Sequence, residues 1–257
     1  MIDAIQEVPY LVKQVYRRGI DMNNRTLVVG DIHGCSKTLS RLLNVIELEP
    51  TDTLYLLGDY IDRGPDSKGV IDIILVLQRE GYDIRPIRGN HEEMMMRAIR
   101  SGVIEDFLQW LNNGGYATLM SYGGISHPRD IPLEHLSFLE ELPFYRMTCQ
   151  YLFVHAGLDF SLDDPLSSAG KTSMLWSRYS KVDSRKIGGR TLVTGHTTQS
   201  LDAIKQSLNT KHLRIDNGCH LGSEFVGKGK GNLVAVDLDT GDMSVQPCID
   251  GMDYDHH

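Results

Sequence analysis

Short apolar stretches that each run into glycine and a polar residue recur in the first third of the chain. Their β-branched and apolar residues, bounded by glycine, are typical of strands. Between them, apolar residues recur with the i, i+3, i+4, i+7 spacing of one helix face, over 39–46 and again over 70–77. The pattern predicts the order β-α-β-α-β. The three stretches and the residues that follow them are Thr26–Val29 before Gly30 and Asp31, Thr53–Leu57 before Gly58 and Asp59, and Asp83–Arg88 before Gly89 and Asn90.

Strands that are joined by helical crossovers run parallel to one another. Because the carboxyl ends of parallel strands lie along one edge, where open α/β sheets bind their ligands, we expect the polar residues after these strands to share a crevice. These residues are Asp31, Asp59 and Asn90.

The rest of the chain is helical in its middle and rich in strands towards its end. Apolar residues at helical spacing dominate residues 91–142. Five strands are predicted beyond them, at Tyr151–Val154, Thr191–Thr194, 211–215, 231–237 and 243–246. A helical middle between strand-rich ends favours an α/β fold of two packed mixed β-sheets flanked by helices, an αββα sandwich.

Neither an internal repeat nor a low-complexity linker divides the chain, so residues 1–257 are predicted to form a single domain. Residues 1–25 are expected to be an N-terminal helical extension, and residues 250–257 a disordered tail. The longest apolar run, Ile73–Leu77, is far shorter than the roughly 20 residues of a membrane span. Acidic residues stand where a signal peptide would be basic, which predicts a cytoplasmic protein.

The net charge is −8, from 26 basic and 34 acidic residues, and no block of like charge occurs. Broad electrostatic binding to nucleic acid or to an anionic membrane is therefore not expected. The cysteines form no C-x-x-C pair, which argues against a zinc ribbon or a redox motif and predicts reduced, structural thiols. They are Cys35, Cys149, Cys219 and Cys248.

Five short motifs carry residue types that bind metals. They are GDIHG at 30–34, GDYIDRG at 58–64, GNHEE at 89–93, HAG at 155–157 and GHT at 195–197. Carboxylate and amide oxygens together with imidazole nitrogens suit borderline ions such as Mn²⁺, Fe or Zn²⁺. Since one metal needs about four ligands and the motifs offer six or seven, two metal ions fit the count better.

In their order, the motifs GDxHG, GDxxDRG and GNHE resemble the signature of the phosphoprotein phosphatase family within the calcineurin-like metallophosphoesterases. The resemblance covers residues 26–220, and the segments WLNNGGYATLMSYG at 110–123 and LWSR at 175–178 are similar to the bacterial and phage branch. It implies a phosphomonoesterase in which a hydroxide that bridges two divalent ions attacks phosphorus in line. The bacterial branch favours Mn²⁺, with Fe and Zn²⁺ as alternatives.

The resemblance also implies which motif residues bind metal. The first ion would be held by Asp31, His33 and Asp59. The second ion would be held by Asp59, Asn90, His155 and His196. Asp59 would then bridge the two ions. Two dications against two carboxylates would leave a local positive charge that attracts phosphate.

His91 follows a metal ligand directly, and the resemblance implies that it stays off the metals and acts as the general acid. Protonating a poor leaving group, such as a serine or threonine alkoxide, contributes roughly 10²–10⁴-fold. Asp62 is the expected partner of its other ring nitrogen. The alternative role for Asp62 is a cap on the next helix.

Two arginines are expected to bind the phosphate together with Asn90. A planar guanidinium makes two parallel bonds to phosphate oxygens and remains charged, which favours Arg63 and Arg178 for this role. Arg178 depends on the short match LWSR, and the alternative is a surface arginine paired with an acid.

Several other residues have two possible roles. Trp110, Tyr116 and Tyr122 could line a peptide groove, although aromatic residues on amphipathic helices more often belong to the core. Asp216, in the segment IDNGC, is expected either to support the metal ligands or to lie in the cleft wall.

The leading hypothesis is a serine/threonine protein phosphatase that acts on a phosphorylated protein or peptide. One rival is a symmetrical diadenosine tetraphosphate hydrolase; by resemblance these enzymes lack the aspartate of DRG and carry GNHD, whereas this chain has Asp62 and Glu92. The other rival is an inactive phosphopeptide-binding module, which the intact set of ligands disfavours. The sequence leaves the physiological substrate and the oligomeric state open.

Overall fold

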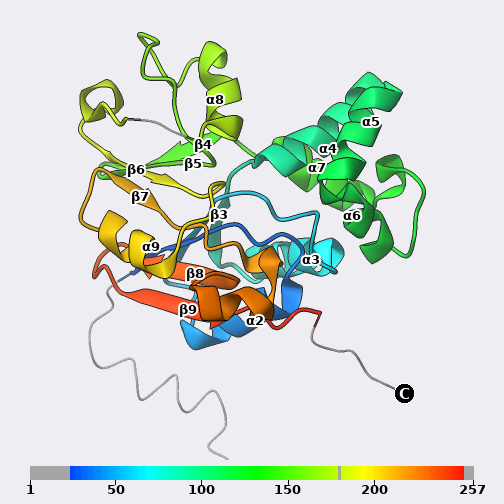
Figure 1. Cartoon of the computed structure of the whole chain (residues 1–257), viewed down its shortest axis with the longest axis horizontal. Coiled ribbons are helices and arrows are strands. Elements are labelled where there is room, and N and C mark those ends of the chain that lie inside the picture. The colour runs from blue at the N-terminus through cyan, green and yellow to red at the C-terminus, as the bar shows by residue number, and fades with distance from the viewer. Residues whose placement is uncertain (1–23, 179–180, 252–257) are drawn as a thin grey trace, which may run out of the picture.

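The computed structural model describes residues 24–178 and 181–251, and two mixed β-sheets form its centre (Figure 1). The first sheet has the strand order β3-β2-β1-β8-β9, with β1 (Thr26–Val29), β2 (Thr53–Leu56), β3 (Asp83–Pro86), β8 (Asn232–Asp237) and β9 (Met243–Pro247). The second has the order β4-β5-β6-β7, with β4 (Tyr145–Met147), β5 (Tyr151–Val154), β6 (Thr191–Thr194) and β7 (His212–Arg214).

Helices flank the sheets, and α4 to α7 gather at one side of them (Figure 1). The helices are α2 (Ser36–Val45), α3 (Ser67–Arg79), α4 (Asn90–Ser101), α5 (Ile104–Trp110), α6 (Tyr116–Ser121), α7 (Leu133–Glu141), α8 (Lys171–Trp176) and α9 (Leu201–Ser207). A π-helical turn, η1 (Leu111–Gly115), joins α5 to α6. The 3₁₀ turns are η2 (Pro128–Asp130), η3 (Ser168–Gly170), η4 (Ser184–Ile187), η5 (Cys219–Leu221) and η6 (Ser223–Lys228).

Strand directions confirm the predicted sandwich of two mixed sheets. Strands β1, β2 and β3 are parallel, and so are β5, β6 and β7, while β8 and β4 each run antiparallel to their neighbours. The three-residue strand β4 is the one that the sequence pattern did not predict. None of the helices in the described part of the chain is long and apolar enough to cross a membrane.

Side chains of β1 alternate between two apolar layers, as the two-residue period of a strand requires. Val28 packs between the sheets, where the rings of Tyr55 and Phe153 stack with their centroids 3.8 Å apart. Leu27 and Val29 point the other way, into the core that the first sheet shares with α2, α3 and α4. The inter-sheet layer therefore holds the two sheets face to face.

The carboxyl ends of both sets of parallel strands meet at one place. In the first sheet, Val29 pairs with Leu56, and Leu56 with Pro86, so the loops after the three strands begin side by side. The loops after β5 and β6 are joined by a hydrogen bond from the Gly195 N–H to the His155 carbonyl, at 2.8 Å. All five motifs thus lie at this end of the sandwich.

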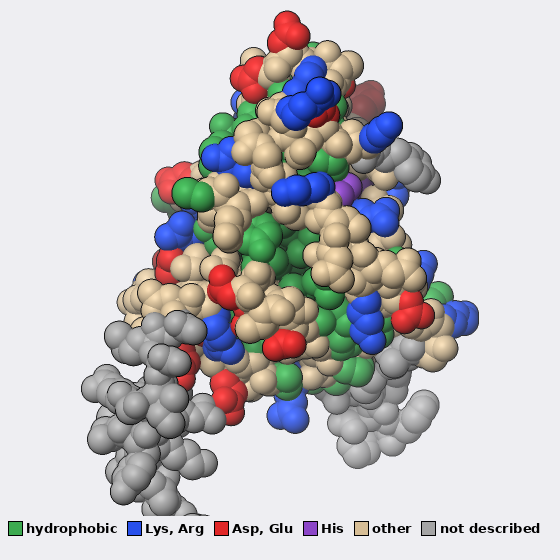
Figure 2. Space-filling model, turned by 90° about the vertical axis from the view of Figure 1, so that its left-hand side faces the viewer, with side chains coloured by type: hydrophobic (Ala, Val, Ile, Leu, Met, Phe, Trp, Pro, Cys, Tyr) green, Lys and Arg blue, Asp and Glu red, His purple; other side chains and the backbone are tan. Residues whose placement is uncertain are grey.

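The outer surface carries charges of both signs. Figure 2 shows one face, on which basic and acidic side chains are interspersed around a hollow lined by hydrophobic side chains. Because the two signs are mixed there, their fields partly cancel over that face.

Three of the four cysteines lie together, although they are widely separated in the sequence. Cys35, Cys219 and Cys248 are buried, and their sulfur atoms all lie within 4.8 Å of one another. We call these three residues the cysteine cluster. Cys149 is exposed, and all four thiols are free. The expectation of free thiols is met, but the sequence pattern did not predict that three of them would be neighbours.

The two ends of the chain fall largely outside the described residues. The expected N-terminal helical extension does so up to residue 23, and the expected tail from residue 252 onwards. Asp250, the first residue assigned to that tail, accepts hydrogen bonds from the N–H groups of Lys37 and Thr38, at 3.0 and 2.9 Å. The cap residue Cys35 makes no side-chain bond to α2, so Asp250 satisfies the start of that helix instead.

Asp250→Ala is expected to lower the free energy of unfolding by about 1–2 kcal/mol, because two helix N–H donors lose their acceptor. Urea denaturation measures the change. As the matched control, Asp242→Ala in the exposed turn between β8 and β9 should stay within about 0.5 kcal/mol of the unchanged protein. Equal losses in the two variants would contradict the capping role.

Candidate active site

The motif loops hold several predicted site residues in an unusual backbone conformation. Among the described residues, six that are not glycine have a positive φ, and five of these are predicted site residues: His33, Asp59, Asp62, Arg63 and His196. Such a conformation costs about 1–3 kcal/mol per residue and persists only where surrounding contacts enforce it. The motif loops therefore depend on their neighbours for their shape.

Two glycines permit the close approach of neighbouring motif loops. A Cβ at Gly58 would lie 2.5 Å from the Gly89 nitrogen, and Gly58 itself has a φ of +93°. A Cβ at Gly195 would lie 2.0 Å from an oxygen of Asp31. Larger residues at these positions would force the ligand-bearing loops apart.

Glu92 ties two of the motif loops together through backbone N–H groups. Its carboxylate accepts hydrogen bonds from Gly89 and Asp59, both at 2.9 Å, and from Tyr60 at 2.8 Å. Burial and the charge of Asp59 raise the pKa of Glu92 to about 7. This role of Glu92 was missed from the sequence, although an acid at the third helical position after Gly89 is a signal for this kind of contact.

Hydrogen-bond acceptors face one another around His155. Its Nδ1 lies 2.8 Å from the Leu57 carbonyl oxygen, which can only accept, so Nδ1 carries the proton. In the neutral ring, the Nε2 lone pair then points at Asn90 Oδ1, 2.8 Å away, and lies 3.4 Å from Asp59 Oδ1. His196 Nδ1 is 3.0 Å from the same Asn90 oxygen. Facing lone pairs of this kind are unfavourable in a buried site, and a cation or an added proton between them relieves the repulsion.

His33 lies on the other side of Asp59, and here Arg63 Nη1 supplies a donor to its Nε2 at 2.9 Å. Its Nδ1 bonds to the Ile61 carbonyl at 3.0 Å, and its Nε2 lies 3.3 Å from Asp59 Oδ2. Asp59 therefore presents one oxygen to His33 and the other to His155. Burial alone would raise the pKa of Asp59, but the charges of the surrounding histidines outweigh burial and lower it.

Asp31 is buried next to Asp59 and the surrounding histidines. Its two oxygens accept bonds from the His196 N–H at 3.1 and 3.0 Å. Burial and the charges of Asp216 and Asp59 raise the pKa of Asp31 well above its usual range. Asp216 itself is buried and accepts bonds from the Gly218 N–H and the Thr198 hydroxyl. Asp216 was expected either to support the metal ligands or to lie in the cleft wall, and its buried position beside Asp31 fits the first of these roles.

The donor set fits two divalent ions that share Asp59. Among the described residues, two groups that share Asp59 have ligand atoms within 4.8 Å of one another. One is His33, Asp59 and His91, and the other is Asp59, His155 and His196. The first group thus includes His91, which was expected to stay off the metals, and neither group includes the predicted ligand Asp31. Oxygen and imidazole donors of this kind suit borderline divalent ions. The carbonyl bonds of His33 and His155 fix their ring orientation, as is typical of metal-binding histidines.

His91 has a carboxylate on one ring nitrogen and no hydrogen-bond partner on the other. Nδ1 donates to Asp62 Oδ2 at 2.7 Å, whereas Nε2 is buried and unpartnered among the described residues, 4.0 Å from Asp59 Oδ2. Burial lowers the pKa of His91, but the charge of Asp59 and the bond to Asp62 outweigh it, so the pKa is raised. The charged imidazolium is thereby favoured.

Asp62 is held by residues from the α5–η1–α6 segment. Its carboxylate accepts bonds from Trp110 Nε1 at 2.9 Å and from the Thr118 hydroxyl at 2.7 Å. The helix that follows, α3, is capped by Asp66, so the alternative role of Asp62 as its cap is wrong. Trp110 is a core residue, and its support of Asp62 was missed; the available signal is that a buried indole N–H needs an acceptor.

A cavity of about 370 Å³ opens beside these groups. Both predicted arginines line it, and Arg63 Nη1 lies 2.9 Å from His33 Nε2. The Arg63 N–H also donates to the Gly114 carbonyl at 3.2 Å. The lining residues that the sequence analysis did not predict are Asn113, Trp176, Thr197, Thr198 and His220.

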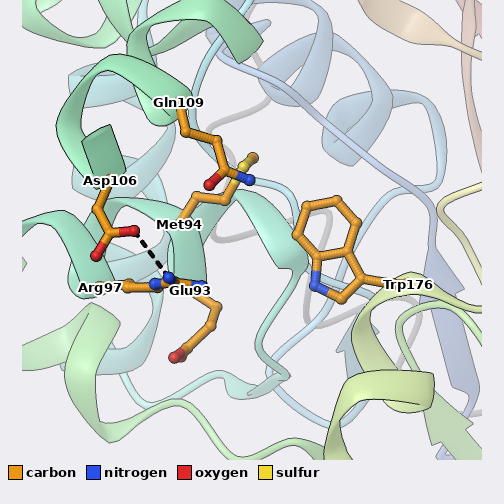
Figure 3. Close-up of a pocket in the computed structure, with 6 residues that line it drawn as sticks. All are labelled: Glu93, Met94, Arg97, Asp106, Gln109 and Trp176. Atoms are coloured by element: carbon orange, nitrogen blue, oxygen red, sulfur yellow. Dashed lines mark ion pairs between the residues drawn. The ribbon is translucent and has the colours of Figure 1, made fainter.

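Trp176 also lines a separate, smaller pocket of about 60 Å³ (Figure 3). The indole of Trp176 lines both spaces, and across the smaller one Arg97 and Asp106 form an ion pair at 2.9 Å. Tyr116 and Tyr122 are absent from both linings. Of the aromatic residues considered for a substrate groove, neither tyrosine reaches it, and Trp176 was missed.

Comparisons with known proteins agree with this geometry. The model of the calcineurin-like phosphoesterase family matches residues 24–204. The serine/threonine-protein phosphatase 1 of Salmonella typhimurium is 42% identical over 105 residues, which are 40% of this chain and 45% of that protein. The symmetrical bis(5'-nucleosyl)-tetraphosphatase of an Acidovorax species is 34% identical over 113 residues, 37% of this chain and 39% of that protein. The chain thus spans less than half the length of these two relatives.

A solved structure shows the same fold. The protein serine/threonine phosphatase from Saccharomyces cerevisiae superposes with a TM-score of 0.60 over 90% of this chain and 82% of that one, at 16% identity. At that identity the match bears on the fold alone.

Asp62→Asn is expected to lower the pKa of His91, because the carboxylate that stabilises the imidazolium is lost while burial continues to oppose it. NMR titration of the metal-free protein measures this pKa. As the matched control, Asp72→Asn removes the carboxylate partner of His135 and should leave the His91 titration unchanged. An unaltered His91 pKa in the Asp62 variant would contradict the pairing.

Proposed function

The chain belongs to the calcineurin-like phosphoesterase family, and we propose that it hydrolyses phosphoserine and phosphothreonine residues in proteins. The observation that carries the proposal is the buried pair of Asp62 and His91, whose bond of 2.7 Å leaves His91 Nε2 with no partner in the part of the chain that the structure describes. A serine or threonine alkoxide is a poor leaving group, so its hydrolysis needs a proton donor of this kind.

The metal ligands are proposed as two sets that share Asp59. The first ion would be held by Asp31, His33 and Asp59, and the second by Asp59, Asn90, His155 and His196. Two such ions, Mn²⁺ or alternatively Fe or Zn²⁺, supply an activated water as nucleophile and positive charge beside the phosphoryl oxygens when bound. The acceptors that face one another around His155 are the feature that supports this assignment.

His91 is proposed to supply the proton to the leaving oxygen from Nε2. Asp62 keeps the other ring nitrogen protonated and favours the imidazolium, which is the form that donates. Proton donation of this kind contributes roughly 10²–10⁴-fold to the rate. Trp110 and Thr118 position Asp62 and do not line the cavity themselves.

Arg63 and Arg178 are proposed to bind the phosphate together with Asn90. Both guanidinium groups line the cavity, where their paired N–H donors suit phosphate oxygens. Arg63 donates to His33 Nε2 at 2.9 Å. A cation on that nitrogen would remove the acceptor and leave the guanidinium donors for the phosphate.

Symmetrical dinucleoside tetraphosphate hydrolysis is the second candidate. It is favoured by the 34% identity with the Acidovorax tetraphosphatase and by the exposed indole of Trp176, which offers a base a stacking surface at the cavity. Asp62 and Glu92 speak against it, since the sequence analysis expects tetraphosphate hydrolases to differ at both positions. A phosphopeptide-binding module without activity is disfavoured because no ligand residue is missing.

The experiment that tests the proposal compares kcat/KM for several substrates with Mn²⁺-supplemented protein. These are phosphoseryl, phosphothreonyl and phosphotyrosyl peptides and diadenosine tetraphosphate. The phosphoseryl or phosphothreonyl peptides are expected to exceed the dinucleotide by at least about tenfold, or about 1.4 kcal/mol of transition-state binding. A preference for the dinucleotide would overturn the substrate assignment and leave the phosphoesterase chemistry standing.

His91→Asn is expected to lower kcat on a phosphoseryl peptide by roughly 10²–10⁴-fold while the metal content, measured by mass spectrometry, persists. With p-nitrophenyl phosphate the loss should be smaller, because nitrophenolate leaves without a proton. His135→Asn, at a histidine that pairs with Asp72 and Tyr122, serves as the control and should change neither rate. Equal losses on both substrates would contradict the role of His91 as the acid.

A further inference from the structure

The cysteine cluster joins three segments of the chain at one buried point. Cys35 lies two residues after His33 at the start of α2, Cys219 opens η5 directly before His220, and Cys248 follows β9. Each residue is at most 2% exposed. The three sulfur atoms lie within 4.8 Å of one another, without a disulfide bond between them. We propose that the cluster is a second metal site, for a thiolate-preferring cation such as Zn²⁺ or Cu⁺.

The spacing of the sulfur atoms is close to what a shared ion requires. An ion about 2.3 Å from each sulfur in tetrahedral geometry places the sulfurs roughly 3.8 Å apart. Cys35 Sγ and Cys248 Sγ are 4.0 Å apart. The structure thus needs small side-chain adjustments, and no movement of a strand or helix, to bring the donors to bonding distance.

The thiols otherwise make only weak polar contacts. Cys35 Sγ lies 3.4 Å from the His33 carbonyl oxygen, and Cys248 Sγ lies 3.8 Å from that of Asp250. Sulfur is a weak hydrogen-bond donor and acceptor, so these contacts compete poorly with a metal–thiolate bond. Metal binding would release the thiol protons to solvent and form a sulfur–metal bond at each cysteine, without a change of oxidation state.

Donor chemistry separates this site from the centre around Asp59. Thiolates suit Cu⁺ and Zn²⁺, whereas the oxygen and imidazole set around Asp59 suits harder and borderline ions, Zn²⁺ among them, and suits Cu⁺ poorly. Within the described residues the cluster contributes three donors, which is enough for a three-coordinate ion and leaves one position of a tetrahedral ion for a non-protein ligand. The proposal does not depend on the proposed phosphatase function.

An ion at the cluster would fasten the segment that follows β9 to the start of α2 and to η5, which lies beside the cavity. Asp250 already bonds to the first turn of α2, two residues beyond Cys248. His220, next to Cys219, lines the cavity with Arg63. Because an ion that binds the folded chain and not the unfolded one stabilises the fold, occupancy should raise the melting temperature.

Cadmium titration tests the site, because thiolate ligands give an ultraviolet sulfur-to-cadmium absorption that carboxylate and imidazole ligands do not. The experiment uses the full chain with Cys149→Ser, which removes the exposed thiol. We expect the absorption to saturate at one Cd²⁺ per chain with an increase in melting temperature. Cys248→Ser in the same background should remove at least one third of the absorption, which is the contribution of one of the three sulfur atoms. As the matched control, the Cys149→Ser chain is compared with the unchanged chain, and the two should give the same absorption.

Two results would overturn the proposal. One is the absence of the absorption with the folded Cys149→Ser chain, which would leave the cysteines as packed apolar side chains. The other is an absorption that Cys248→Ser does not reduce. Should Cys248→Ser fail to fold, as circular dichroism would show, alkylation of the Cys149→Ser chain decides the question. Bound Cd²⁺ should then slow the labelling of Cys35, Cys219 and Cys248 together, and equal labelling rates with and without Cd²⁺ would count against the site.

Discussion

The crowding of negative charge and lone pairs at one end of the sandwich is the constraint on which the rest of the structure depends. Asp31, Asp59 and Asp216 are buried there, beside imidazole nitrogens that present lone pairs. Groups of this kind are costly in a medium of low dielectric constant unless donors or cations face them. Backbone N–H groups supply part of the compensation. The N–H of His196 donates to Asp31, that of His91 to Asp59, and that of Gly218 to Asp216.

This crowding explains why the fold needs two sheets. The first sheet brings the loops of Asp31, Asp59 and Asn90 together, but the remaining donors come from β5 and β6 of the second. The packing of Tyr55 on Phe153 holds the sheets in register, so that His155 and His196 reach the Asp59 side of the first sheet. The apolar layer between the sheets thus determines the geometry of the polar end.

The sequence predicts local features better than contacts that arise from distant segments. Strand ends and motif residues such as Asp31 and Asn90 were predictable, because the apolar stretch, the glycine and the polar residue that mark them are adjacent in the sequence. The support of Asp62 by Trp110 spans 48 residues, and the contact of Cys35 with Cys248 spans 213. Neither leaves a periodic trace, because only the tertiary packing of α5 and β9 brings the partners together. Strand β4 was missed because three residues are too few to show a period.

The α5–η1–α6 segment has a consequence for how this fold could be altered. It is bound to Asp62 and Arg63 of the DRG sequence, through Trp110 to Asp62 and through the Gly114 carbonyl to Arg63. A Cβ at Gly114 would lie 2.8 Å from Arg63 Cγ. The same segment contributes Gln109 and Asn113 to the walls beyond the metal ligands. A graft that exchanges this segment to change selectivity would also disturb Asp62 and, through it, the proposed proton donor His91. Recombination or design would therefore have to transfer residues 58–64 and 110–118 together, because the contacts between the two segments depend on both.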